Sequence, residues 1–133
     1  MRHPRTERWE AKLKKVFDQI DHRLEAEYGD RFSLHPARAK KGTTGNAETD
    51  GLFNVGAAFS AGYGSQHGRG YVVEVRMATL RQVPHALRER IAERVADWLR
   101  EELPAAFPGR KLEVKRDGRV YKITGDLSLD KSA

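Results

Sequence analysis

The fold is decided by the stretch Leu52–Leu80, which reads LFNVGAAFSAGYGSQHGRGYVVEVRMATL. Successive side chains of a strand point to opposite faces, so a half-buried strand shows apolar residues at every second position. Both halves of this stretch alternate in that way, and a glycine-rich segment separates them. The stretch therefore predicts two neighbouring strands joined by a loop that is longer than a tight hairpin turn.

The first of these strands has one apolar face and one almost bare face. Its bare face consists of small or polar residues, namely Asn54, Gly56, Ala58, Ser60, Gly62 and Gly64. Small residues let a helix, another sheet or a ligand approach the backbone closely. We expect a helix to pack on this bare face, with ligand contact and dimerisation as the alternatives.

The loop Gly62–Gly70 carries four glycines with Ser65, His67 and Arg69 between them. Exposed amides beside a hydroxyl and a cation suit an anion. A catalytic interpretation would make His67 a general base and Arg69 an anion stabiliser. Because no carboxylate is paired with His67, an exposed turn histidine is the favoured interpretation, and we predict no catalytic residue.

Two amphipathic helices flank this pair of strands. Apolar residues recur at spacings of three and four through residues 6–28, and again from Val83-Pro84 onward. Gly29 follows the first helix, as glycine often does at a helix end. We expect Pro104 to end the second helix, because proline lacks the amide that a helix interior needs.

A second hairpin follows, with Asp117-Gly118 as its two-residue turn. This turn places Val114 opposite Tyr121 on the apolar face. It also places Glu113 opposite Lys122 on the other face, as a favourable cross-strand charge pair. The basic residues Arg116 and Arg119 flank the turn.

The predicted fold class is α+β, with the element order α-β-β-α-β-β. We expect two layers, in which both helices cover one face of a mostly antiparallel four-stranded sheet. The 133 residues predict a single domain, 1–133, with a mobile loop at 34–51 and a frayed tail at 130–133.

The segment 34–51 shows no hydrophobic period, and it contains the run Gly42-Thr43-Thr44-Gly45. The basic residues Arg38, Lys40 and Lys41 lie just before this run. Amides, hydroxyls and lysines together suit a phosphate group, so this segment is a second candidate for anion binding. Disorder is the alternative interpretation.

Composition excludes several classes of protein. The chain has no cysteine, which excludes disulfides, cysteine-bound zinc, iron–sulfur clusters and a thiol nucleophile. Its five histidines show no metal-binding spacing, so we predict neither a metal nor a cofactor. No apolar run is long enough to cross a membrane and no secretory signal is visible, so we expect a cytoplasmic protein without a membrane partner.

The formal net charge of +6 favours anionic partners. We expect a small basic binding module for a phosphate-bearing partner, with nucleic acid or a phosphorylated ligand as the candidates. The predicted contacts are polar or cationic residues of three segments: Arg38, Lys40, Lys41, Thr43, Thr44, Ser65, His67, Arg69, Arg116 and Arg119.

Two alternatives remain. One is a small-ligand-binding protein or enzyme with its site at Gly62–Gly70, although the sequence favours a protein that is not an enzyme. The other is a structural or assembly protein that forms a homodimer through the bare sheet face.

Overall fold

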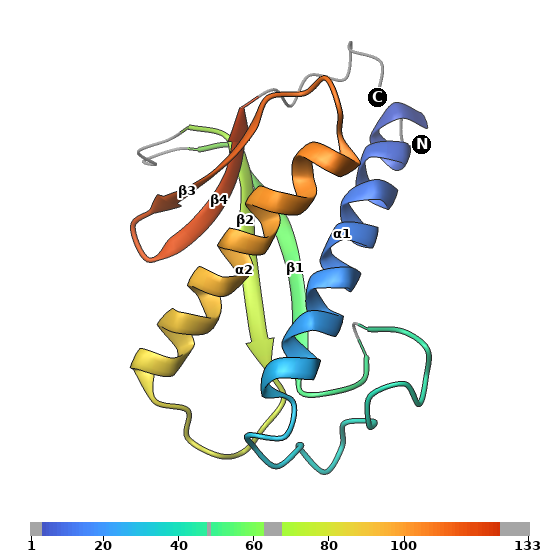
Figure 1. Ribbon diagram of the computed structural model, residues 1–133, viewed down its shortest axis with the longest axis vertical. Coiled ribbons are helices and arrows are strands. Elements are labelled where there is room, and N and C mark those ends of the chain that lie inside the picture. Colours follow the sequence, from blue (N-terminus) through green and yellow to red (C-terminus); the bar gives the residue numbers. More distant parts are fainter. Residues whose placement is uncertain (1–3, 48, 63–67, 126–133) are drawn as a thin grey trace.

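The computed structural model describes residues 4–47, 49–62 and 68–125 (Figure 1). The predicted α+β fold and the element order are confirmed. The elements in chain order are α1 (Pro4–Tyr28), β1 (Phe53–Ser60), β2 (Gly70–Met77), α2 (His85–Ala106), β3 (Leu112–Asp117) and β4 (Val120–Gly125).

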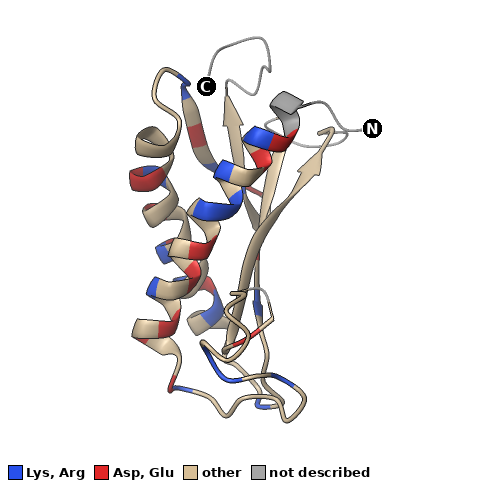
Figure 2. Cartoon of the chain, turned by 90° about the vertical axis from the view of Figure 1, so that its right-hand side faces the viewer, with Lys and Arg blue, Asp and Glu red and all other residues tan. Residues whose placement is uncertain are grey.

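The molecule has two layers, which Figure 2 shows side by side with the helices on the left. The four strands form an antiparallel sheet in the order β1-β2-β4-β3, so β1 and β3 are the edge strands. Both helices lie on the same face of this sheet. This is the arrangement expected when two amphipathic helices bury their apolar stripes against one sheet face.

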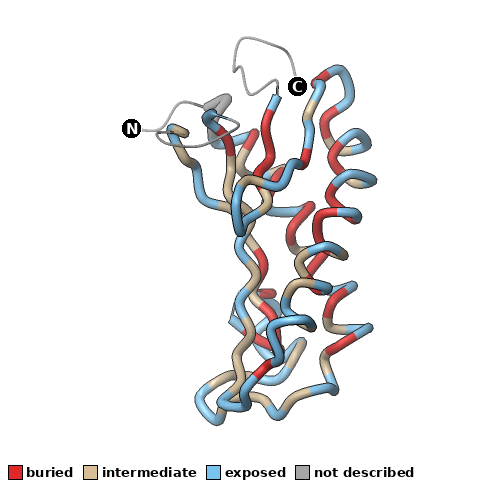
Figure 3. The backbone as a smooth tube through the Cα atoms, turned by 90° about the vertical axis from the view of Figure 1, so that its left-hand side faces the viewer, coloured by how far each residue is buried: buried red, intermediate tan, exposed pale blue. Residues whose placement is uncertain are grey.

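The core lies between the two layers, where the buried residues of Figure 3 gather. Trp9 packs its ring against Phe107 with the centroids 4.4 Å apart, and its indole Nε1 donates to the Tyr71 hydroxyl at 3.0 Å. Phe107 is only 1% exposed, and burial of a side chain of this size contributes about 2 to 3 kcal/mol. These contacts join α1, β2 and the end of α2.

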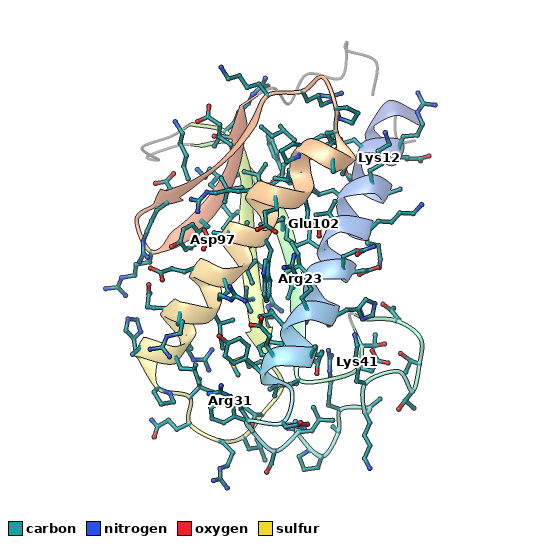
Figure 4. The ribbon with its side chains drawn as sticks, in the orientation of Figure 1. Lys12, Arg23, Arg31, Lys41, Asp97 and Glu102 are labelled. Atoms are coloured by element: carbon teal, nitrogen blue, oxygen red, sulfur yellow. The ribbon has the colours of Figure 1, made fainter. Side chains whose placement is uncertain are left out.

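Charged side chains also join the two helices. Arg23 of α1 reaches Glu102 of α2 at 3.6 Å, and Figure 4 shows the two side chains pointing toward each other. The guanidinium of Arg23 also lies 4.5 Å from the ring centroid of Trp98. The two helices are therefore joined by an ion pair and a cation–π contact in addition to their apolar contacts.

The helices cover the apolar face of β1, and the expectation that a helix packs on the bare face is wrong. Phe53 and Val55 are buried, whereas Ala58 of the bare face is exposed and an added Cβ at Gly56 meets nothing within 4 Å. The apolar side chains decide this, because each buried Å² of apolar surface contributes about 25 cal/mol and glycine offers almost none. A homodimer through the bare face stays a prediction.

Hydrogen bonding in the β1–β2 ladder alternates. The Ala78 N–H donates to the Leu52 carbonyl at 2.7 Å. Leu52 and Ala78 are therefore a hydrogen-bonded pair, and the next pair along the ladder is Phe53 with Met77. In an antiparallel ladder only every second pair exchanges such bonds. It follows that the odd-numbered residues of β1 point their N–H and C=O groups away from β2, toward the free edge.

The register predicted for the second hairpin is wrong by two residues. The turn is Gly118-Arg119, so Val114 lies opposite Ile123 and Lys122 lies opposite Lys115, not opposite Glu113. Gly118 has φ +65°, which suits the two-residue turn with glycine in its first central position. A shift of two keeps every side chain on its predicted face, so the apolar face is as expected.

The prediction that Pro104 ends the second helix is also wrong, because α2 continues to Ala106. A proline near the last turn removes one amide donor and leaves the rest of the helix intact. Leu103, just before the proline, and Phe107, just after the helix, lie in the core, each 1% exposed. This burial offsets the lost hydrogen bond.

Candidate functional site

The loop between α1 and β1 is organised around the carboxylate of Asp50, which is 1% exposed. Its Oδ2 accepts the N–H groups of Gly42 at 3.0 Å and Thr44 at 3.2 Å. Burial alone would raise the pKa of Asp50, but the hydrogen bonds from Thr44 and Gly42, with the charge of Lys41, outweigh it and lower this pKa. Two amides that the sequence assigned to a phosphate therefore bind a carboxylate of the chain itself.

Arg38 holds the same loop from the other side. Its Nε donates to the Gly51 carbonyl at 2.9 Å, and its Nη2 donates to the carbonyls of Asp50 at 3.1 Å and Phe53 at 3.2 Å. A guanidinium is well suited to this task because its donors have a fixed fork geometry. Arg38 thus ties the loop to the first residue of β1.

Lys41 is paired with a buried carboxylate of α1. Its Nζ lies 3.2 Å from Oδ1 of Asp21, which is only 2% exposed, and Figure 4 shows Lys41 beside α1. Burial raises the pKa of Asp21 to about 6, although the bond to Lys41 acts in the opposite direction. This pair fastens the loop to the helix.

The remaining predicted residues of this loop behave differently from one another. Lys40 and Thr43 are exposed, while the Thr44 hydroxyl lies 2.8 Å from that of Thr49. The mobility predicted for residues 34–51 stays a prediction. The structure shows that hydrogen bonds to the Asp50 carboxylate connect residues of this loop.

Sequence reasoning missed Asp21 and Asp50. Asp21 carries a usable signal, because it lies four residues after Phe17 and three before Leu24, inside the apolar stripe of α1. An acid at such a position is buried and needs a partner. Within the described residues, no three acidic or histidine side chains gather in a way that could hold a metal ion.

The second glycine loop lies at the opposite end of β1 (Figure 1). Ser65 and His67 lie outside the described residues, and Arg69 is exposed. The described part of this loop is tied to the sheet, because Lys122 donates from Nζ to the Gly68 carbonyl at 2.9 Å and also pairs with Asp117 at 2.9 Å. The described parts of the two glycine loops therefore do not form one basic surface.

The predicted pair Arg116 and Arg119 splits between two environments. Arg116 is paired with Glu89 of α2 at 3.0 Å and donates to the Gly118 carbonyl at 3.1 Å. Its hydrogen bond to Glu89 raises the pKa of Arg116 further above its usual value. Arg119 instead lines a groove between α2 and the β3–β4 hairpin.

This groove, called here the α2–hairpin groove, has a volume of about 290 Å³. Val73 and Val75 of β2 and Ile91 of α2 supply its apolar part. Arg88 and Arg119 belong to its polar part, together with His85. Ligand sites typically combine an apolar lining with a few polar groups that fix the orientation of the ligand.

The groove exists because β4 leaves β2 early. Among the described residues, the two strands pair at Tyr71 with Ile123 and at Val72 with Lys122, and Figure 1 shows the hairpin turning away from β2 beyond this point. By the alternation of the ladder, Val73 and Val75 point their N–H and C=O groups to this side. The wall of the groove thus offers main-chain donors and acceptors as well as apolar side chains.

The charges of the groove are unbalanced. Its single acid, Glu89, is shared between Arg116 at 3.0 Å and His85 at 3.7 Å. In the part of the chain that the structure describes, the guanidinium groups of Arg88 and Arg119 have no hydrogen-bond or ion-pair partner. The sequence contained no sign of this groove, because it results from the divergence of two strands.

The chain belongs to a protein family described as "Uncharacterised protein", which matches residues 4–125. It is 40% identical over 106 residues to an uncharacterized protein of Borreliella burgdorferi (strain ATCC 35210 / DSM 4680 / CIP 102532 / B31). The match covers 80% of this chain and 83% of that protein. No solved structure matches the chain.

Neither α1 nor α2, as far as the structure describes them, is long and apolar enough to span a lipid bilayer.

Proposed function

We propose that this protein is a binding module for a small apolar ligand that carries one acidic group, held in the α2–hairpin groove. The proposal rests on one observation. The guanidinium groups of Arg88 and Arg119 lie beside the apolar part of the groove and have no hydrogen-bond or ion-pair partner among the described residues. The proposal keeps the anionic partner expected from the sequence and moves its site from the glycine loops to this groove.

The chemistry of arginine supports an acidic group on the ligand. A guanidinium presents parallel donors that match a carboxylate or a phosphate, and it stays charged at any physiological pH. The apolar floor would bind the body of the ligand, while the volume of about 290 Å³ limits that body to a small molecule. Carboxylate and phosphate share this chemistry, so the test distinguishes them.

The test uses the fluorescence of 1-anilinonaphthalene-8-sulfonate, an apolar anion, with decanoate, decyl phosphate and decanol as competitors. We expect both decanoate and decyl phosphate, or one of them, to displace the probe far better than neutral decanol. Affinity should fall as salt is raised, because the interaction includes opposite charges. Equal displacement by decanol would contradict the proposal.

Variants locate the site. Arg88→Ala and Arg119→Ala should each weaken anion binding about tenfold, since a hydrogen bond to a charged group contributes about 1.5 to 3 kcal/mol. Arg90→Ala is the matched control, because Arg90 is an exposed arginine of the same helix and does not line the groove. An equal effect of all three substitutions would indicate an effect of net charge alone.

A single-stranded oligonucleotide provides the remaining arm of the test. Tight, salt-dependent oligonucleotide binding that is unchanged by Arg88→Ala and Arg119→Ala would overturn the groove proposal and favour nucleic acid at another surface.

A further inference from the structure

Within the described ranges 4–47, 49–62 and 68–125, nothing protects the outer edge of β1 over most of its length. The strand reads Phe-Asn-Val-Gly-Ala-Ala-Phe-Ser over eight residues, without a charge or a proline, and its ladder with β2 is continuous from Phe53 to Ser60. Natural sheets usually protect an edge with lysine, proline, a bulge or a covering element, because free N–H and C=O groups invite another strand. None of these devices is present within β1.

The chain does protect the beginning of this edge. The outward N–H of Phe53 donates to Oε1 of Glu25 at 2.8 Å, and the outward carbonyl of Phe53 accepts from Arg38 at 3.2 Å. Beyond Phe53 the next outward residues are Val55, Ala57 and Phe59. Among the described residues, no side chain or loop takes the outward groups of these three.

A groove runs beside the same edge, between α1 and β1. Its volume is about 510 Å³; Leu13 and Phe17 of α1 and Val55 and Ala57 of β1 form its apolar part, and the charged residues Glu10, Lys14 and Asp18 of α1 also line it. At its far end Phe59 is 59% exposed and stacks edge-on against Tyr71 with the centroids 5.6 Å apart. One edge thus carries both an exposed aromatic ring and a groove with an apolar part.

We propose that a second copy of this chain pairs with β1 in antiparallel orientation, with a two-fold axis at Ala57. In this register Ala57 lies opposite Ala57 of the partner subunit, and Val55 lies opposite the partner subunit's Phe59. Outward-pointing residues meet outward-pointing residues, so the free N–H and C=O groups bond across the axis. The result is one continuous sheet of both copies.

Self-complementarity favours a second copy over an unrelated strand. An axis at Ala57 places each exposed Phe59 beside Val55 of the other copy, which belongs to the apolar part of the groove. A two-fold interface must use the same patch on both copies, and this edge supplies the two halves of such a contact. The small residues Gly56, Ala57 and Ala58 at the centre leave room for the two backbones to approach.

The test measures oligomeric state by sedimentation velocity from low to high micromolar concentration. We expect a concentration-dependent dimer that Phe59→Glu shifts to monomer. Leu80→Glu is the matched control, because Leu80 is 74% exposed, lies on the loop after β2 and is not part of the proposed β1 interface, so it should leave the dimer unchanged. A protein that is monomeric at every concentration, or a dimer that survives Phe59→Glu, would overturn the proposal.

A single introduced cysteine tests the register, because the chain has no other thiol. Residues facing each other in a hydrogen-bonded antiparallel pair have Cα atoms about 5.5 Å apart, within the range that a disulfide spans. Ala57→Cys should therefore give a covalent dimer on mild oxidation, and Ala58→Cys should not. Cross-linking of Ala58→Cys without cross-linking of Ala57→Cys would refute the proposed axis.

Discussion

The carboxylate of Glu25 accepts the main-chain N–H of Phe53 at 2.8 Å, across 28 positions of the sequence. Glu25 lies on α1 and Phe53 is the first residue of β1, so this bond fixes the height at which the strand starts relative to the helix. The same carboxylate lies directly over Gly51, where a Cβ would collide with it. The Glu25 side chain thus fixes the start of β1 and also requires a glycine at position 51.

Replacing Glu25 with alanine should destabilise the protein by about 1 to 3 kcal/mol, because a buried N–H loses its acceptor. Urea unfolding followed by circular dichroism measures this loss. Glu27→Ala is the control, since Glu27 forms an exposed ion pair with Arg94, and such pairs contribute less than about 1 kcal/mol. Equal losses for the two variants would contradict the assigned role of Glu25.

Gly51→Ala should be more destabilising than Gly42→Ala. Both glycines have positive φ, +80° and +87°, so each alanine meets a backbone penalty of about 1 to 2 kcal/mol. Only at Gly51 does the new Cβ also collide with Glu25, whereas at Gly42 it meets nothing within 4 Å. Adding Glu25→Ala to Gly51→Ala should relieve part of the loss. Strictly additive free energies of unfolding in this pair would show that the collision is absent.

The stability contribution of Asp21 should decrease as pH rises. Burial raises its pKa to about 6 in the folded protein, against 3.8 as the ordinary value, so the folded state holds the proton more tightly than the unfolded state. The contribution is present in full below pH 4 and is lost as pH rises through 6. At pH 7 the ionised carboxylate costs about 2 to 3 kcal/mol.

Asp21→Asn tests this directly, because an amide does not ionise. The free energy of unfolding of the variant, relative to the parent protein, should rise by about 2 to 3 kcal/mol between pH 4 and pH 7. Asp18→Asn, which changes a partly exposed acid of the same helix, serves as the control. A difference between variant and parent that stays constant across this range would show that Asp21 keeps an ordinary pKa.

Gly70→Ala should weaken the junction between β2 and β4. A Cβ at this position collides with the Ile123 carbonyl and lies 2.8 Å from the Lys122 side chain, so the strands must separate. We expect a loss of about 1 to 3 kcal/mol, the range typical of overpacking. Gly56→Ala is the control within the sheet, because its Cβ meets nothing within 4 Å. Amide hydrogen exchange of Tyr71, whose N–H faces β4, should accelerate in the first variant only.

The elements of this fold could be predicted because periodicity is a local property. The spacing of Phe17, Ile20 and Leu24 identifies α1, and the alternation of Val73, Val75 and Met77 identifies β2. The turn at Gly118 was found, but not its register, since Asp117-Gly118 and Gly118-Arg119 both satisfy the local rules for a two-residue loop.

The site could be predicted only in part, because its residues meet through the tertiary fold. Lys41 and Arg38 looked like free cations in the sequence, but Asp21 and the carbonyls around Asp50 engage them. The α2–hairpin groove depends on where β4 stops pairing with β2, and no local pattern contains that information. Of the eight predicted contacts that lie within the described residues, Arg119 is the one that lines this groove.

The strand order has a consequence for how the chain is synthesised. β4 is the last of the four strands in the chain, yet it lies between β2 and β3 in the sheet. While a ribosome is still extending the chain, the β1–β2 hairpin and β3 therefore have no link through the sheet. The sheet can therefore become continuous only after β4 has left the exit tunnel and paired with both β2 and β3.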